Sequence, residues 1–271
     1  MSFESTTEQL QVTLSDRVAT LVLNRPEARN ALSAELSAEL IRAIAWCGQS
    51  AEVGAVLLTG AGTAFCSGAD VKAMGSRQQA AQPPTAEQRF QEMKARHLGI
   101  GGALHGLRKP TVAALPGAAA GAGMSIALAC DFRLAASSAF LTTAYARIGL
   151  SGDYGIAWLL TRIVGPGRAR ELLLLCERIG AEQALAMGLV TQVVAPEELA
   201  DAARAFTTRL ANGPSVAFAY MKDNLDEALG ISHAEAIERE ADRVVKTNST
   251  ADHKEAVAAF AEKRDPVFQG R

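Results

Sequence analysis

Two segments of the chain share one local pattern, in which a short apolar run leads into a glycine- and alanine-rich turn and then into a helical stretch. The first is LLTGAGTAFCSGADVKAM, residues 57–74, and the second is AALPGAAAGAGMSIALACDF, residues 113–132. Small residues at a turn let another group approach the backbone closely. The N–H groups at a helix start have no partner within the helix and lie at the positive end of its dipole. Two such turns that face one point would offer a pair of donors to a negatively charged oxygen.

Close packing of a helix on a sheet also requires small residues, so each turn alone has two interpretations. Neither turn is a phosphate-binding loop, because the GxxxxGK[ST] pattern is absent from both. The second turn is also not followed by the acidic residue that a dinucleotide site needs. The residues alone therefore leave both structural packing and anion binding open.

Strands and helices alternate through the first part of the chain, and helices dominate the rest. Short apolar runs predict strands at 11–14, 18–23, 53–59, 111–115 and 132–135. A helix is expected after the N-capping residue Ser33, and further helices are expected at 156–163, 169–176, 181–187, 196–210, 214–229 and 233–246. This order predicts an α/β fold in which helices cover the faces of a sheet.

Composition and charge exclude several classes of protein. The chain has 271 residues, of which 49% are hydrophobic and 21% are charged, so it can bury a sizeable core. A net charge of −2 gives no support to nucleic-acid binding. The four cysteines form no CxxC or Cys/His spacing, so we expect no metal and reduced thiols in a cytoplasmic protein. The longest uncharged run is interrupted by Pro116, so we expect no membrane span.

Seven short motifs follow one another along nearly the whole chain. They are LNRPEARNALS (23–33), GTAFCSGADVKAM (62–74), KPTVAALPGAAAGAG (109–123), CDFRLAASSAF (130–140), RIGLSGDYG (147–155), AEQALAMGLVTQVV (181–194) and FAEKRDPVFQGR (260–271). In this order they resemble the enoyl-CoA hydratase/isomerase (crotonase) family. The resemblance implies an α/β spiral of ββα units that binds acyl-CoA in residues 1–195. It also implies a helical C-terminal region, 196–271, which forms trimers and covers the site.

The same resemblance implies which groups bind the thioester. The oxyanion donors would be the backbone N–H groups of Ala69 and Ala122, where Ala122 replaces the glycine that is frequent in the family. Residues expected around coenzyme A are Arg25, Ala28, Ser67, Gly68, Asp70 and Val71. In the family, Phe260 and Lys263 of a neighbouring subunit complete this site, which implies a homotrimer or a hexamer built from two trimers. Coenzyme A would enter as part of the substrate, so no separate cofactor is expected.

The positions of the two glutamates of a family hydratase are occupied by Ser125 and Tyr145. Neither residue readily replaces a carboxylate, because serine is a very weak base and tyrosine has a pKa near ~10. Asp153 lies four residues after Gly149 in GLSGDYG, which on its residues alone is an ordinary turn with an exposed-looking Tyr154. By resemblance, Asp153 is the single acid of the family's isomerases. The nucleophilic aspartate of 4-chlorobenzoyl-CoA dehalogenase also falls there, with an aromatic residue at the position of Tyr145.

We therefore expect double-bond isomerisation by Asp153, with three alternatives left open. A hydratase or an acyl-CoA hydrolase would use Asp153 to position water. A dehalogenase would need a histidine to activate water, and His97 lies about one residue away from the matching register. A catalytically silent acyl-CoA binder would also tolerate the loss of both glutamates. The polar stretch 75–85, GSRQQAAQPPT, is expected to be a loop that borders the acyl site.

Overall fold

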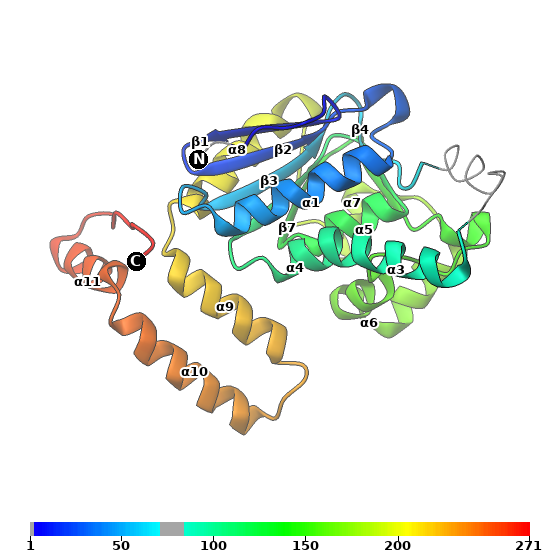
Figure 1. Cartoon of the computed structure of the whole chain (residues 1–271). Coiled ribbons are helices and arrows are strands. Elements are labelled where there is room, and N and C mark those ends of the chain that lie inside the picture. The colour runs from blue at the N-terminus through cyan, green and yellow to red at the C-terminus, as the bar shows by residue number, and fades with distance from the viewer. Residues whose placement is uncertain (1–2, 71–83) are drawn as a thin grey trace.

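The computed structural model describes residues 3–70 and 84–271 (Figure 1). Ten strands form two sheets in this described part of the chain. The larger sheet has the strand order β1-β2-β3-β5-β7-β10, and the smaller has the order β4-β6-β8-β9. Val71 and most of the expected 75–85 loop lie outside the described residues.

The larger sheet starts with a hairpin and continues with parallel strands. Its members are β1 (Leu10–Ser15), β2 (Val18–Leu23), β3 (Ala55–Gly60), β5 (Thr111–Leu115), β7 (Phe132–Ala136) and β10 (Gln192–Val194). β1 and β2 pair antiparallel through a turn at Asp16 and Arg17, which both have positive φ. Every residue of β5 is buried, as expected for a parallel strand covered on both faces. The predictions for 18–23 and 111–115 are confirmed, and the other three lie within two residues of the observed ends.

The smaller sheet gives the fold its repeating unit. Its members are β4 (Ala64–Cys66), β6 (Ala118–Ala120), β8 (Phe140–Thr142) and β9 (Ile179–Gly180). Each of β3, β5 and β7 in the larger sheet is followed directly by β4, β6 or β8 in the smaller one. This succession of strand pairs is the expected crotonase-like spiral.

Helices cover both faces of the larger sheet. The described α-helices are α1 (Ala34–Gln49), α3 (Ala86–His97), α4 (Ala103–Gly106), α5 (Ala122–Ala129), α6 (Ile156–Leu175), α7 (Ala181–Ala186), α8 (Leu199–Ala211), α9 (Ser215–Glu227), α10 (His233–Asn248) and α11 (Ala251–Glu262). α1 lies on one face and α8 on the other, whereas α9, α10 and α11 extend away from the body (Figure 1). Ser33 caps α1, because its Oγ accepts a hydrogen bond from the N–H of Leu36 at 3.0 Å.

Three details differ from the sequence-based expectations. The helices expected at 156–163 and 169–176 join into one helix, α6, which is interrupted by a non-helical Gly165 before Pro166. Several elements were not predicted, namely α11 and the strands β4, β6, β8, β9 and β10. Tyr154 is only 7% exposed, contrary to expectation, because its ring packs against Gly101 and the ring of His97.

The described residues also bear on membranes, metals and thiols. No helix among them is long and apolar enough to cross a membrane. They contain no group of three or more His, Cys, Asp or Glu residues arranged to hold a metal ion. All four cysteines are free and buried.

The contact of α5 with β4 leaves no space for a side chain at Gly123. A methyl group there would lie 2.2 Å from the carbonyl oxygen of Cys66. We expect Gly123→Ala to lower the free energy of unfolding by about 1–3 kcal/mol, measured by chemical denaturation, because the backbone must move. Gly167→Ala in α6 is the matched control, since no atom lies within 4 Å of the added methyl. Equal stability of the two variants would contradict the close contact.

Candidate active site

The backbones of the two glycine-rich turns lie in close contact. Gly68 has a φ of +99°, and a Cβ placed on it would lie 3.5 Å from the amide nitrogen of Ala122. The turn is held by the N–H of Leu32, which donates to the carbonyl of Gly68 at 2.9 Å. In the described part of the chain, neither Ala69 nor Ala122 donates a hydrogen bond through its own N–H. The expected pair of donors is therefore close together and unpaired.

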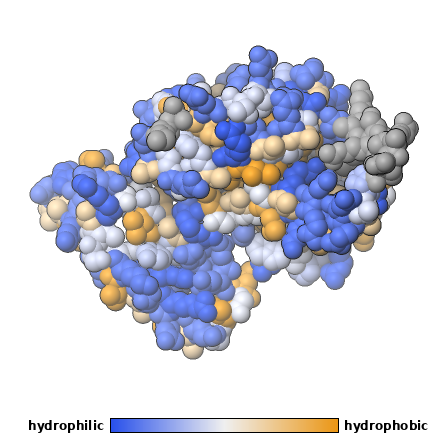
Figure 2. Space-filling model, viewed as in Figure 1, coloured by the Kyte–Doolittle hydropathy of each residue, from blue (hydrophilic) through white to orange (hydrophobic). Residues whose placement is uncertain are grey.

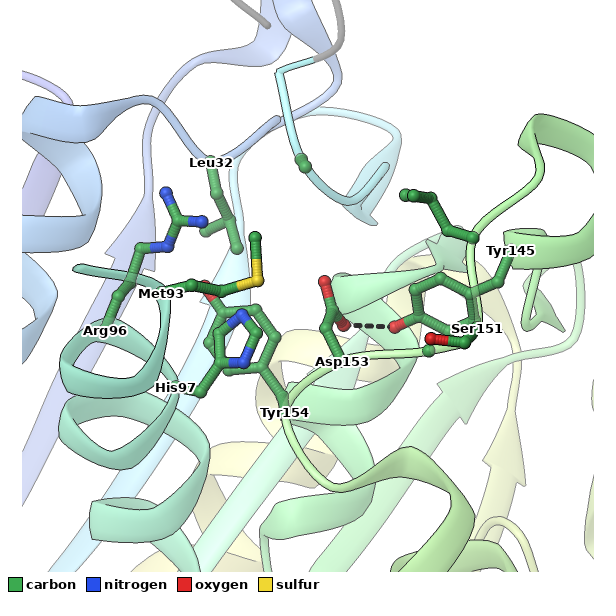
Figure 3. A pocket seen from close by; sticks show the side chains of 11 residues that line it. Leu32, Met93, Arg96, His97, Tyr145, Ser151, Asp153 and Tyr154 are labelled. Atoms are coloured by element: carbon green, nitrogen blue, oxygen red, sulfur yellow. Dashed lines mark hydrogen bonds between the residues drawn. The ribbon is translucent and has the colours of Figure 1, made fainter. Parts of the chain in front are cut away.

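Ala69 lies on the wall of a cavity of about 140 Å³ (Figure 3). The residues that line it are Leu32, Ala69, Met93, Arg96, His97, Tyr145, Leu150, Ser151, Gly152, Asp153 and Tyr154. They come from the start of α1, the turn after β4, α3, and the segment between β8 and α6. The lining combines apolar side chains with several polar and charged ones, and such convergence of polar groups on one cavity is typical of a small-molecule site.

Asp153 faces this cavity. It lies in the loop between the 3₁₀ turn Tyr145–Ile148 and α6, in which Gly152 and Gly155 both have positive φ. Its backbone carbonyl accepts from the N–H of Ile156 at 3.0 Å, as a turn residue would. Its side chain, however, points into the cavity and accepts a hydrogen bond from the Tyr145 hydroxyl (Figure 3). The turn interpretation and the interpretation as a site residue are therefore compatible.

The two positions that hold glutamates in a family hydratase form a hydrogen-bonded chain that ends at Asp153. Because the Tyr145 proton is donated to Asp153, the Ser125 hydroxyl donates to the Tyr145 oxygen, 2.8 Å away, and the carbonyl of Gly121 at 3.2 Å is its alternative acceptor. Both side chains are buried. Ser125 thus reaches the cavity only through Tyr145, and Tyr145 orients the carboxylate of Asp153.

Burial changes the protonation of both partners. It raises the pKa of Asp153, while the hydrogen bond from Tyr145 and then the charge of Arg96 oppose the rise. Burial, reinforced by the charge of Asp153, raises the pKa of Tyr145 well above its ordinary value. The phenol therefore stays protonated and acts as a donor, and Asp153 is a stronger base than a solvated aspartate.

The opposite wall is formed by α3. Burial, followed by the neighbouring Arg96, lowers the pKa of His97 to about 4, so its ring is neutral near pH 7. The ring centroids of His97 and Tyr154 are 4.1 Å apart. Sequence analysis singled out His97 but missed Arg96 and Met93. The signal was available, because Met93, Arg96 and His97 follow the i, i+3, i+4 spacing of one helix face.

Most of the residues expected around coenzyme A gather in one place. The guanidinium of Arg25 pairs with Asp70 at 3.2 Å and donates to the carbonyl of Ala31 at 2.6 Å. The hydroxyl of Ser67 donates to the carbonyl of Ala28 at 3.3 Å, directly before Gly68. These contacts bring Arg25, Ala28, Ser67, Gly68 and Asp70 together, although they do not test their binding role.

Phe260 and Lys263 lie elsewhere. Phe260 is on α11 and is 87% exposed, and Lys263 follows the end of that helix. α11 lies at the far side of the chain from the turn after β4 (Figure 1). These two residues could therefore join the expected coenzyme A site only from another chain.

Comparisons with known proteins agree with this geometry. The family profile described as Enoyl-CoA hydratase/isomerase matches residues 13–271. A protein of Rhodobacter capsulatus named "Probable enoyl-CoA hydratase" is 38% identical over 95% of this chain and 96% of its own. The 1,2-epoxyphenylacetyl-CoA isomerase of Escherichia coli is 35% identical over 94% and 95%. The crystal structure of an enoyl-CoA hydratase from Polaromonas sp. JS666 superimposes with a TM-score of 0.89, at 33% identity, over 96% of this chain and 99% of that one.

The spiral of paired strands brings the unpaired N–H of Ala69 and the partly buried carboxylate of Asp153 to a single cavity, and the N–H of Ala122 lies close to the same turn. The profile match over nearly the whole chain, together with sequence identities above 30% to known relatives, identifies the enzyme family. The chain belongs to the enoyl-CoA hydratase/isomerase family.

Replacement of Tyr145 tests the electrostatics of the site. We expect Tyr145→Phe to raise the pKa of Asp153, because burial remains while the hydrogen bond that lowers this pKa is lost. The ¹³C carboxyl shift of Asp153, followed by NMR against pH, should move its midpoint to higher pH. Tyr220→Phe on α9 is the matched control and should leave the titration unchanged. An unaltered midpoint in Tyr145→Phe would show that the phenol does not stabilise the carboxylate.

Proposed function

We propose that this enzyme moves the double bond of enoyl-CoA thioesters from C3 to C2, with Asp153 as its single acid–base group. The observation that carries the proposal is the composition of the cavity. Asp153 contributes the only carboxylate among the described residues that line it, and it faces the same space as Ala69. A family hydratase would need two carboxylates to hold and activate water.

The proposed reaction needs one base that can act twice. The N–H groups of Ala69 and Ala122 hydrogen-bond the thioester oxygen, while the carboxylate of Asp153 removes a proton from Cα. The electron pair left at Cα is delocalised into the thioester and the double bond as a dienolate. The same carboxyl group then returns its proton to Cγ, and the conjugated thioester is formed. Tyr145 keeps the carboxylate in place through its hydrogen bond.

Hydration is the second candidate, and the names of relatives favour it. Besides the Rhodobacter capsulatus protein, a relative from Clostridium acetobutylicum, 33% identical over 92% of each chain, is named short-chain-enoyl-CoA hydratase. Asp153 would then position water alone. The raised pKa of Tyr145 weighs against this route, because the phenol cannot serve as the second base near neutral pH. Hydrolysis, dehalogenation and silent binding are the remaining outcomes that an assay would distinguish.

Asp153→Asn separates these reactions. We expect wild-type protein to convert 3-hexenoyl-CoA to the conjugated thioester without a change in mass, and the variant to lose at least ~10²-fold in kcat. Absorbance of the conjugated thioester and mass spectrometry of the products, with crotonyl-CoA as the hydration substrate, provide the readout. Asp201→Asn, on the exposed side of α8, is the matched control.

Folding failure would not explain a loss in the variant. Since burial raises the pKa of Asp153, the charged carboxylate destabilises the native state once the pH exceeds the unfolded pKa. Asn removes that cost, so the thermal midpoint at pH 7 should stay equal or rise. Gain of one water by crotonyl-CoA that persists in Asp153→Asn would disprove the isomerase proposal.

We also propose a homotrimer, or a hexamer of two trimers, that needs no cofactor beyond the coenzyme A of its substrate. The helices α9, α10 and α11 expose large apolar side chains, which are scattered over their surface in Figure 2. The most exposed are Leu225, Val245 and Phe260, together with Leu229 just after the end of α9. Contact with other copies would bury them and would bring Phe260 to a neighbour's coenzyme A site. Location in the cytoplasm stays a prediction from the reduced, buried thiols.

Light scattering coupled to size exclusion tests the assembly. We expect a particle of three or six times the 28.4 kDa chain mass at micromolar concentration. A dilution series should show whether the mass is constant. A stable species of 28.4 kDa would contradict the proposal.

A further inference from the structure

The wall of the cavity that faces Asp153 carries a guanidinium group. Arg96 lies on the last turn of α3, together with Met93 and His97, across the cavity from Asp153 (Figure 3). The preceding residues of α3 are all exposed, whereas Arg96 and His97 are partly buried. Because His97 is neutral near pH 7, Arg96 is the one cation among the described residues of this wall.

This guanidinium has an unused donor. The Nε of Arg96 is covered and has no hydrogen-bond partner, and no other buried side-chain nitrogen or oxygen of the described residues is in this state. Burial raises the pKa values of Asp153 and Tyr154, and the charge of Arg96 opposes both rises. A side-chain hydrogen bond between Arg96 and Tyr154 also lowers the pKa of Tyr154. Arg96 nevertheless forms no ion pair within 4 Å among the described residues, and Asp153 instead accepts the hydrogen bond of Tyr145.

The residues outside the described part of the chain include no carboxylate that could pair with Arg96. Residues 71–83 read VKAMGSRQQAAQP and contain neither Asp nor Glu. Asp70, which precedes them, is paired with Arg25. The protein therefore supplies a partly buried cation without a dedicated counter-ion.

A partly buried guanidinium whose covered Nε–H has no partner is costly, so its presence on the cavity wall points to a ligand group that pairs with it. An unsatisfied buried donor costs free energy, and the cost is larger for a charged group. The planar guanidinium fork fits a carboxylate through two parallel hydrogen bonds, which is the strongest pairing available to it. The apolar side chains of Leu32 and Met93 flank Arg96 and would contact the carbon chain that leads to such a carboxylate.

We infer that Arg96 makes the cavity selective for acyl groups that carry a second carboxylate at their far end, so that the substrates are coenzyme A thioesters of short dicarboxylic acids. This inference rests on the proposed function in one respect, namely that the cavity holds the acyl part of the thioester. With the thioester oxygen at Ala69 and the reacting carbons at Asp153, the distal end of a short chain reaches α3. The cavity of about 140 Å³ has room for a short acyl group.

Equilibrium binding of saturated thioesters tests the inference without any turnover. Calorimetry would compare succinyl-CoA with butyryl-CoA, glutaryl-CoA with valeryl-CoA, and adipyl-CoA with hexanoyl-CoA at pH 7. Each pair differs only by the terminal carboxylate. We expect the best-fitting dicarboxylic ester to bind about tenfold more tightly than its partner, as a charged hydrogen bond predicts.

Three variants of α3 assign the preference to the guanidinium. Arg96→Met should abolish the preference, and Arg96→Lys should keep part of it because the charge remains but the fork is lost. Arg89→Met, on the exposed side of α3, should leave both affinities unchanged. Thermal unfolding of each variant confirms that it is folded.

Several results would overturn the inference. One is equal or tighter binding of the monocarboxylic ester in all three pairs, and another is a preference that survives Arg96→Met. An equal loss for both members of a pair, and for free coenzyme A, would show that the guanidinium binds the phosphates of coenzyme A instead. Failure of free coenzyme A and of every ester to bind the wild-type protein would overturn the acyl-CoA site itself. Failure of isomerisation alone leaves this binding test unaffected.

Discussion

The backbone contact between the turn after β4 and the start of α5 is the constraint on which the site depends. A methyl group on Gly117 would lie 2.0 Å from the carbonyl of Thr63, and one on Gly123 would lie 2.2 Å from that of Cys66. The first contact lies where the chain enters β4 and β6, and the second lies between β4 and α5, so at both places only the hydrogen atom of a glycine fits. The amide of Ala122 is thereby fixed beside Gly68, and all eight residues of α5 are buried. Donors held in this way need no reorganisation when a negative charge develops on the thioester oxygen.

Because this backbone contact is rigid, the reaction that the site can perform depends on which acidic side chain lies beside it. Ser125 projects from α5 and meets Tyr145, and the phenol in turn orients Asp153. These hydrogen bonds fix the position of Asp153. They provide no base, because burial raises the pKa of Tyr145 and its phenol stays protonated. Basicity is thus confined to one carboxylate, whose own pKa is raised. One base on one face of a dienolate suits a proton transfer between two carbons better than the addition of water, which needs two groups.

The sequence predicted what depends on local pattern and missed what depends on packing. The strands at 18–23 and 111–115 were correctly placed, since apolar β-forming residues bounded by turns define them. The two glycine-rich turns were recognised as a pair, and the family resemblance then implied the N–H groups of Ala69 and Ala122 as donors, which stays a prediction. The prediction that Tyr154 is exposed was wrong. Its glycine neighbours suggest exposure, whereas contact with α3 and Gly101 buries it. Arg96 was missed for a related reason, since an arginine on a polar helix normally faces water.

Because α3 forms one wall of the cavity, the two walls differ in charge, which the two turns alone would not cause. One wall carries the carboxylate of Asp153, and the other carries the cation of Arg96 beside a neutral His97. Opposite charges on facing walls create an electric field across this small space. An acyl group with a negative far end gains free energy only when that end lies at α3, which leaves its reactive carbons at Asp153. An uncharged acyl group lacks this electrostatic contribution to the binding free energy. Its orientation depends on the fit of its carbon chain between Leu32, Met93 and Tyr154. Charge placement on α3 would thus select both the substrate and the end of it that reacts.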